Sequence, residues 1–338
     1  MNRELAHKVA DAVLYEGYML YPYRPSAIKN RQRWTFGILY PPAYPEVADG
    51  TERSRMHTEC LVEAGGETSL NLELRFLHLV ARQVAQRVSD RFEPVASLMV
   101  DQKLIESWDE GVDRSVSFDL SLAGPDQSFH FSFPAIASEG TLHDYAGELA
   151  GKLTRAQHEI CGAISVATEA VGQRLLKLKI EVLNETSLPA ATAGRDAALL
   201  RSLLSAHTIL TLSGGSFISL LDPPEQFRDV VGQCVNIGNF PVLVGNSHER
   251  DMLLCSAIVL YDYPQIAPES AGDFYDATEM DEMLTLRVMT LTDEEKQEAQ
   301  LADDRVRSLL QRTEQTARHQ LMRTHGTIRE LRVVGGEP

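Results

Sequence analysis

Cysteine is scarce in this chain and never closely spaced. Its four cysteines lie far apart over 338 residues: Cys60, Cys161, Cys234 and Cys255. Zinc sites and disulfide frameworks usually show closely spaced cysteines, such as a C-x-x-C pair, so this spacing predicts neither. We expect buried free thiols in a reducing cytosol.

Positive charge is also in short supply. The chain has 32 Lys and Arg residues against 48 Asp and Glu residues, a formal net charge of −16. Because nucleic acids are bound through their phosphates by cationic surfaces, this balance argues against a nucleic-acid partner. A local basic strip remains able to bind an anion.

Long apolar runs are missing. No segment approaches the run of about eighteen apolar residues that a membrane-spanning helix needs. The opening residues, MNRELAHKVADAVLYEGY, scatter acids and bases where a signal peptide has an apolar core. We therefore expect a cytoplasmic protein without membrane insertion.

Catalytic and metal-binding motifs are absent or incomplete. The chain has no G-x-S-x-G motif, and Gly214-Gly215-Ser216 lacks the lysine of a phosphate-binding loop, which favours a hairpin turn. His57 with Cys60, and His158 with Cys161, resemble half-sites for Zn²⁺ or Ni²⁺, but two half-sites would have to meet in space. If 56–64 is a strand, residues three apart point to opposite faces. We expect no cofactor, no metal and no enzyme signature.

What the chain does have is a cationic aromatic strip, defined as Tyr15 to Trp34, YEGYMLYPYRPSAIKNRQRW. Tyrosine, tryptophan and arginine anchor recognition surfaces because they combine large rigid contact areas with directional polar groups. The sequence thus predicts a partner-binding surface. Its residues would be Tyr18, Tyr21, Tyr23, Arg24 and Trp34. The alternative is a core role, with the tyrosines packed under a sheet and the cations reaching solvent.

The periodicity predicts a β-dominated α+β fold with antiparallel, sandwich-like sheets. A short N-terminal helix over 4–14 precedes a strand over 33–40 and another over 56–64, after which Gly65-Gly66 turns the chain. A third strand covers 69–79, and 80–89 fits either a strand or a helix.

Further strands are indicated along the middle of the chain. They are expected at 98–100, 115–122, 129–133, 175–182, 207–212, 217–221, 240–244 and 253–261. Gly124-Pro125-Asp126 would join 115–122 to 129–133 as a hairpin, and Gly214-Gly215 would turn the chain again. A short helix is expected over 225–235.

The C-terminal part is predicted to be helical. Thr292-Asp293-Glu294-Glu295 forms a capping box, and the long helix that it opens should run to about Thr324. The resulting organisation has four parts. They are an α+β segment over 1–94, a β-sandwich-like region over 95–224, a small α/β segment over 225–292, and the C-terminal helix over 293–325.

An acidic stretch over 262–282 carries seven Asp and Glu residues and no Lys or Arg. Its carboxylates could bind Ca²⁺ or Mg²⁺, although the spacing misses the EF-hand pattern. Acids that complement a helix N-terminus explain the stretch as well, and so does an electrostatic docking surface.

Three segments together resemble a known family. They are AVLYEGYMLYPYRPSAIKNRQRWTFGILYPP, ISLLDPP at 218–224 and APESAGDFYDATEMDEMLTLRVMTLTDEEK at 267–296. They look like a family of accessory proteins encoded beside NiFe-hydrogenase genes, notably with the high-affinity uptake enzymes of actinobacteria and some soil proteobacteria. The resemblance implies a cytoplasmic accessory or scaffold protein that binds a hydrogenase subunit or maturation protein, and a homo-oligomer is possible. It brings no fold or residue role. The rival hypothesis is an enzyme whose site is assembled from sequence-distant residues.

Overall fold

The structure is a computed structural model, and it describes six ranges of the chain: 2–18, 36–101, 103–189, 194–265, 281–302 and 304–315. The helices are α1 (Asn2–Tyr15), α3 (Pro45–Ala48), α4 (Arg195–Leu199), the 3-10 helix η2 (Glu225–Phe227), α5 (Arg228–Val231), α6 (Asp281–Met289), α7 (Asp293–Ala302) and α8 (Asp304–Gln315). The strands are β1 (Arg55–Val88), β2 (Arg91–Val95), β3 (Ser97–Val100), β4 (Lys103–Glu106), β5 (Trp108–Ser121), β6 (Gln127–Phe133), β7 (Ile136–His143), β8 (Leu149–Gln157), β9 (Ile160–Ala170), β10 (Leu175–Asn184), β11 (Leu204–Phe217), β12 (Phe240–Leu243) and β13 (Met252–Ser256).

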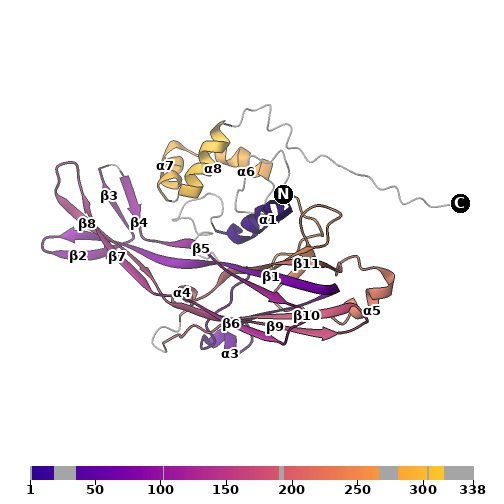
Figure 1. The fold of residues 1–338 in the computed structure, drawn as a ribbon. Helices are drawn as coiled ribbons and strands as arrows, with labels where there is room; N and C mark the ends of the chain where they lie inside the picture. The colour runs from indigo at the N-terminus through magenta and orange to yellow at the C-terminus, as the bar shows by residue number, and fades with distance from the viewer. Residues whose placement is uncertain are drawn as a thin grey trace.

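The fold is β-dominated and antiparallel, as predicted. One curled sheet of 11 strands forms the body, and β3 and β4 make a separate hairpin. Where sandwich-like sheets were predicted, the body is this one 11-stranded sheet, which curls around its core. In Figure 1, β2, β7 and β8 and the β3–β4 hairpin project to one side of the body, while α1, α6, α7 and α8 lie above the sheet.

Strand β1 organises the whole sheet because it is 34 residues long. It pairs with β10 and β11 near its start, with β11 and β5 in its middle, and with β8 and β2 at its end. The prediction of a strand over 69–79 is confirmed, and the undecided residues 80–88 continue it. Period-2 burial explains the outcome, since Leu70, Leu72 and Leu74 all enter one core.

The two predicted glycine turns are wrong. Both Gly65-Gly66 and Gly214-Gly215 lie inside strands, β1 and β11, where the register between the two strands shifts. The backbones of the two strands approach so closely that a Cβ on Gly65 would lie 2.6 Å from the carbonyl oxygen of Gly214. Gly214 also has a φ of +80°, which favours glycine. The glycines thus make a bulge that bends the sheet instead of reversing the chain.

The predicted hairpin between β5 and β6 is wrong as well. A tight turn is present, since the Gly124 N–H donates to the Ser121 carbonyl at 3.2 Å. Beyond the turn, however, β5 pairs with β1, and β6 pairs with β9. The two strands meet only through side chains, with the rings of Phe118 and Phe129 stacked at 4.4 Å.

The core lies inside the curl of the sheet. Its buried residues come from β1, β5, β6, β9, β10, β11, β12 and β13, together with Leu39, Leu122 and Leu203 from the connecting segments. The opposite face of β11 and β13 is covered by α1, whose Val9, Ala10 and Val13 pack against Ile209 and Leu254. This amphipathic packing confirms the short N-terminal helix.

The helices described in the C-terminal region are short, and they do not show the predicted long helix over 293–324. The capping box is correct: the Thr292 N–H donates to the Glu295 carboxylate at 3.0 Å, and the Glu295 N–H donates to the Thr292 hydroxyl at 3.2 Å. The helix that it opens is α7, described over Asp293–Ala302, and α8 is described from Asp304. Leu284, Val306 and Leu309 bury their side chains in the cluster above the sheet.

Other predicted elements are shorter or differ. Within 33–40 only residues 36–40 are described, and there Leu39 makes a single bridge to Leu203. The helix over 225–235 is the shorter pair η2 and α5. The predicted boundaries of the four parts stay predictions. Strand β1, in the first predicted part, does pair with β5 in the second. No helix among the described residues is long and apolar enough to cross a membrane.

Candidate functional site

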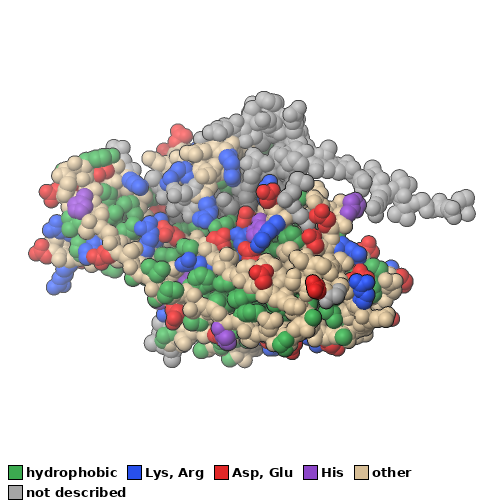
Figure 2. Space-filling view, viewed as in Figure 1, with side chains coloured by type: hydrophobic (Ala, Val, Ile, Leu, Met, Phe, Trp, Pro, Cys, Tyr) green, Lys and Arg blue, Asp and Glu red, His purple; other side chains and the backbone are tan. Residues whose placement is uncertain are grey.

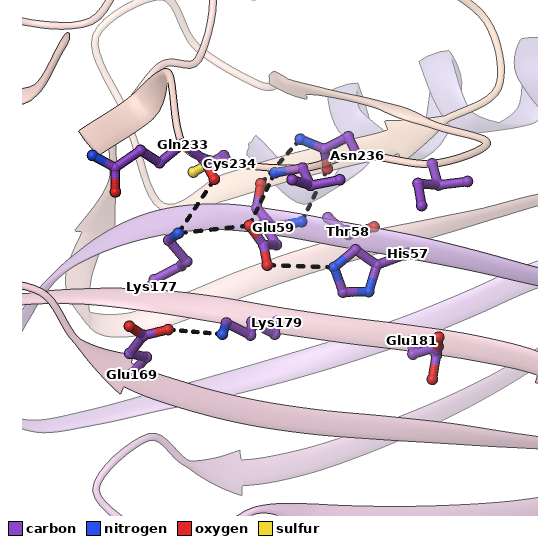
Figure 3. A network of polar contacts seen from close by, with 12 residues as sticks. His57, Thr58, Glu59, Glu169, Lys177, Lys179, Glu181, Gln233, Cys234 and Asn236 are labelled. Carbon is purple, nitrogen blue, oxygen red and sulfur yellow. Dashed lines mark hydrogen bonds and ion pairs between the residues drawn. The ribbon is translucent and has the colours of Figure 1, made fainter. Parts of the chain in front are cut away.

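A buried polar network anchors the loop after α5 to β1 (Figure 3). One carboxylate oxygen of Glu59 accepts the Val235 N–H at 2.9 Å, and Lys177 Nζ lies 3.7 Å from the same oxygen. His57 Nε2 lies 3.4 Å from the other oxygen. Burial raises the pKa of Glu59, but the Val235 N–H, His57 and Lys177 outweigh it and leave that pKa below its ordinary value.

The same network holds the loop through its backbone. The Glu59 N–H donates to Asn236 Oδ1 at 3.0 Å, and Asn236 Nδ2 donates back to the Glu59 carbonyl at 3.2 Å. Lys177 Nζ also donates to the Gln233 carbonyl at 3.3 Å. These contacts fix residues 233–236 and position the side chains that follow them.

Beside this loop lies an apolar edge surface, defined by Phe36, Ile237 and Phe240. The three side chains line a cavity of about 500 Å³ next to β12, the edge strand of the sheet. They are 37%, 38% and 47% exposed. The segment that leaves the cavity at Ala257 carries two more exposed side chains, Val259 at 71% and Tyr261 at 87%.

The predicted strip residues are only partly described. Tyr21, Tyr23, Arg24 and Trp34 lie outside the described residues, so their partner-binding role stays a prediction. Tyr18 is fully buried and packs in the cluster under α6 and α8, so it takes the core role of the alternative hypothesis. The physical reason is that burying its ring removes a large apolar area from water.

A cationic side chain does accompany these tyrosines, but it comes from the other end of the chain. Arg305 of α8 donates to the Tyr15 hydroxyl at 2.6 Å, and its guanidinium lies 4.3 Å from the centre of the Tyr15 ring and 5.5 Å from that of Tyr18. Burial raises the pKa of Tyr15 despite the neighbouring Arg305. The contact ties the C-terminal helices to the end of α1.

A second cavity, the basic cleft, lies between the projecting strands and α8. It has a volume of about 750 Å³. Its charged lining residues are Arg82, Lys103, Glu110, Asp113, Arg155, Arg305 and Arg307. On the face drawn in Figure 2, Lys and Arg side chains gather between the projecting strands and the helices above the sheet.

Beneath α1, Arg75 is buried between two carboxylates. Its Nη2 lies 2.8 Å from Asp11 Oδ1 of the helix and 2.8 Å from Asp113 Oδ2 of β5. His207 is the cross-strand neighbour of Arg75, and burial lowers its pKa to about 4. Its Nδ1 lies 2.8 Å from the Ser205 carbonyl. This arrangement holds α1 on the sheet.

The half-sites for a soft metal do not assemble in the part of the chain that is described. Cys60 faces the core while His57 faces the Glu59 network, as expected for residues three apart on a strand. His158 contacts Arg201 at 3.3 Å. No group of three His, Cys, Asp or Glu residues able to hold a metal ion occurs among the described residues. The acidic residues 266–280 lie outside them.

The comparisons with known proteins return no match, neither a family model nor a curated protein. The charged residues of the basic cleft were missed in the sequence because they come from five separate elements. On β1 and β5, Arg82 and Glu110 stand among other polar residues, Gln83 and Asp109, as is typical of any solvent-facing strand. No sequence signal distinguishes these charges from ordinary surface charges.

Proposed function

We propose that the protein is a cytoplasmic accessory or scaffold protein that binds a hydrogenase subunit or maturation protein during NiFe-hydrogenase assembly. The family resemblance of the three quoted segments supplies the context. The observation that carries the binding role is the edge surface, where Phe36, Ile237 and Phe240 present apolar side chains around a cavity.

Exposed apolar side chains that gather on one surface mark interaction sites, because isolated ones are ordinary but contiguous ones cost solvation free energy. Aromatic side chains that enter a partner's pocket typically contribute about 2 kcal/mol or more when they lie at the centre of an interface. The loop that carries part of the edge surface is also held in place by hydrogen bonds. The Asn236 and Lys177 contacts fix the loop, so little conformational entropy is lost on binding.

A second candidate function is catalysis at a site assembled from sequence-distant residues. The observation that favours it is the basic cleft, whose lining brings together residues far apart in the chain, from Arg82 to Arg307. Among the described residues that line this cleft there is no histidine, cysteine or serine. An enzyme of this kind would act through its arginines and carboxylates.

The deciding experiment is a pull-down from the native cytosol, combined with metal analysis of the purified protein. We compare the wild type with the double variant Ile237→Asp/Phe240→Asp and with the control Ile136→Asp, which changes an exposed apolar residue on β7. Wild type and control should recover a hydrogenase subunit or maturation protein, and the double variant should not. Equal recovery by all three proteins at matched folded concentration would refute the edge surface as the binding site.

A further inference from the structure

The basic cleft carries an excess of positive charge, although the protein as a whole is negatively charged. Five cationic and two acidic side chains line it, an excess of three positive charges in a chain of net charge −16. One of the two acids, Asp113, is shared with the buried Arg75 at 2.8 Å. The cleft therefore offers a ligand a positive local field within a negative molecule.

The register of the sheet explains how the cations come together. Arg82 on β1 and Arg155 on β8 are directly opposite in the antiparallel pair. Like charges at such positions repel each other and destabilise a sheet. Glu110 of β5 offsets one of them: it lies 2.8 Å from Arg82 Nη1 and 3.0 Å from Arg155 Nε. The three side chains retain one net positive charge.

Two other elements add cations to the same cavity. Lys103 follows the turn of the β3–β4 hairpin, where Asp101 adopts a left-handed φ of 49° and Val100 pairs with Lys103. Lys103 is exposed and makes no ion pair with any residue that the structure describes. From the other side, α8 contributes Arg305 and Arg307, which flank the buried Val306.

We propose that the basic cleft binds a small organic molecule that carries two or more anionic oxygen groups, either phosphate or carboxylate. Guanidinium groups form paired hydrogen bonds with both kinds of group, and the volume of about 750 Å³ lies in the range of small-molecule sites. This inference goes beyond partner binding, because it concerns a different part of the molecule. The pull-down can fail without affecting it.

The test is isothermal titration of the full chain with two probes, inorganic pyrophosphate and citrate. The variants are Lys103→Gln and Arg307→Gln, with Arg307→Lys as the charge-conserving variant. The matched control is Arg228→Gln, which removes an exposed arginine of α5 that is paired with Glu225 and lies outside the cleft. Circular dichroism and thermal melting establish that every variant is folded.

We expect saturable binding of at least one probe that weakens as salt is added, because the attraction is electrostatic. Each Gln variant should lower the affinity by about tenfold, and Arg228→Gln should stay close to wild type. Arg307→Lys keeps the charge but loses the paired donors, so its affinity should fall between those of wild type and Arg307→Gln. Pyrophosphate binding alone would identify a phosphate ligand, and citrate binding alone a carboxylate ligand. Failure of both probes to bind at about 1 mM, or equal weakening by Arg228→Gln, would overturn the proposal.

Discussion

Replacing Glu59 by Gln should destabilise the protein far more than replacing a neighbouring exposed glutamate. The side chains of Glu59 and Lys177 are each only 10% exposed, and Glu59 is the carboxylate at the centre of the network in Figure 3. The amide of Gln keeps an oxygen for the Val235 N–H but removes the negative charge. Lys177 would then be buried without its carboxylate.

The magnitude follows from what the substitution removes. A hydrogen bond to a charged group contributes roughly 1.5–3 kcal/mol, and an uncompensated buried charge adds a desolvation cost. The pair is separated by 3.7 Å, and Lys177 retains the Gln233 carbonyl at 3.3 Å, so part of the cost is relieved. We expect Glu59→Gln to lower the free energy of unfolding by about 2–3 kcal/mol at neutral pH.

The pH dependence provides the internal check. The pKa of folded Glu59 is depressed below the ordinary value of 4.5, so its contribution is present above that value and is lost as the pH falls through the folded pKa. The assay is urea unfolding of both proteins at neutral pH and at successively lower pH. The difference between wild type and Glu59→Gln should therefore shrink in acid.

The control is Glu169→Gln, which removes an exposed carboxylate 2.7 Å from Lys179 on the same region of the sheet. Exposed ion pairs contribute little to stability, so this variant should unfold like wild type. Equal destabilisation by the two substitutions, or a Glu59→Gln effect that persists unchanged in acid, would refute the reasoning.

Other predictions concern His207, the glycine bulge at Gly214, the cationic aromatic strip and the metal content. Burial lowers the pKa of His207 to about 4 in the folded protein, so as the pH falls the unfolded chain binds a proton at this residue before the folded protein does. Stability should therefore decrease between about pH 6.5 and pH 4. His207→Gln should make the free energy of unfolding, measured in urea, less dependent on pH over this range. Gly214→Val should cost at least about 2 kcal/mol in the same assay, because φ is +80° and a Cβ would lie 2.6 Å from the Glu67 carbonyl. Tyr21→Ala and Arg24→Ala should each reduce recovery of a hydrogenase subunit at an unchanged melting temperature; a lower melting temperature with unchanged recovery would favour a core role. Elemental analysis after mild purification should find no stoichiometric transition metal.

Local signals in the sequence predicted local structure well. The capping box at Thr292 was correct because its hydrogen bonds join residues three apart. The strand over 69–79 was correct because alternation directly reports one buried face. The length of the helix after Thr292 was not predicted, since it depends on how α7 and α8 pack on the sheet.

The failures share a physical cause, which is that long-range pairing selects between locally equivalent outcomes. A Gly-Gly pair allows a turn or a bulge, and the close approach of Gly65 to Gly214 selected the bulge. The turn at Gly124 is present, yet β5 pairs with β1 and β6 pairs with β9, so the two strands beside the turn do not form a hairpin. The basic cleft depends on the same pairing, because only the register of β1 and β8 brings Arg82 opposite Arg155.

The most direct test of the proposed function is hydrogen–deuterium exchange of the protein alone and in complex with the hydrogenase subunit or maturation protein recovered in the pull-down. Partner binding at the edge surface predicts slower amide exchange at residues 235–243 and 257–261 in the complex, with unchanged exchange at the exposed strand β7. Unchanged exchange at both of those segments, with slower exchange elsewhere, would contradict the account.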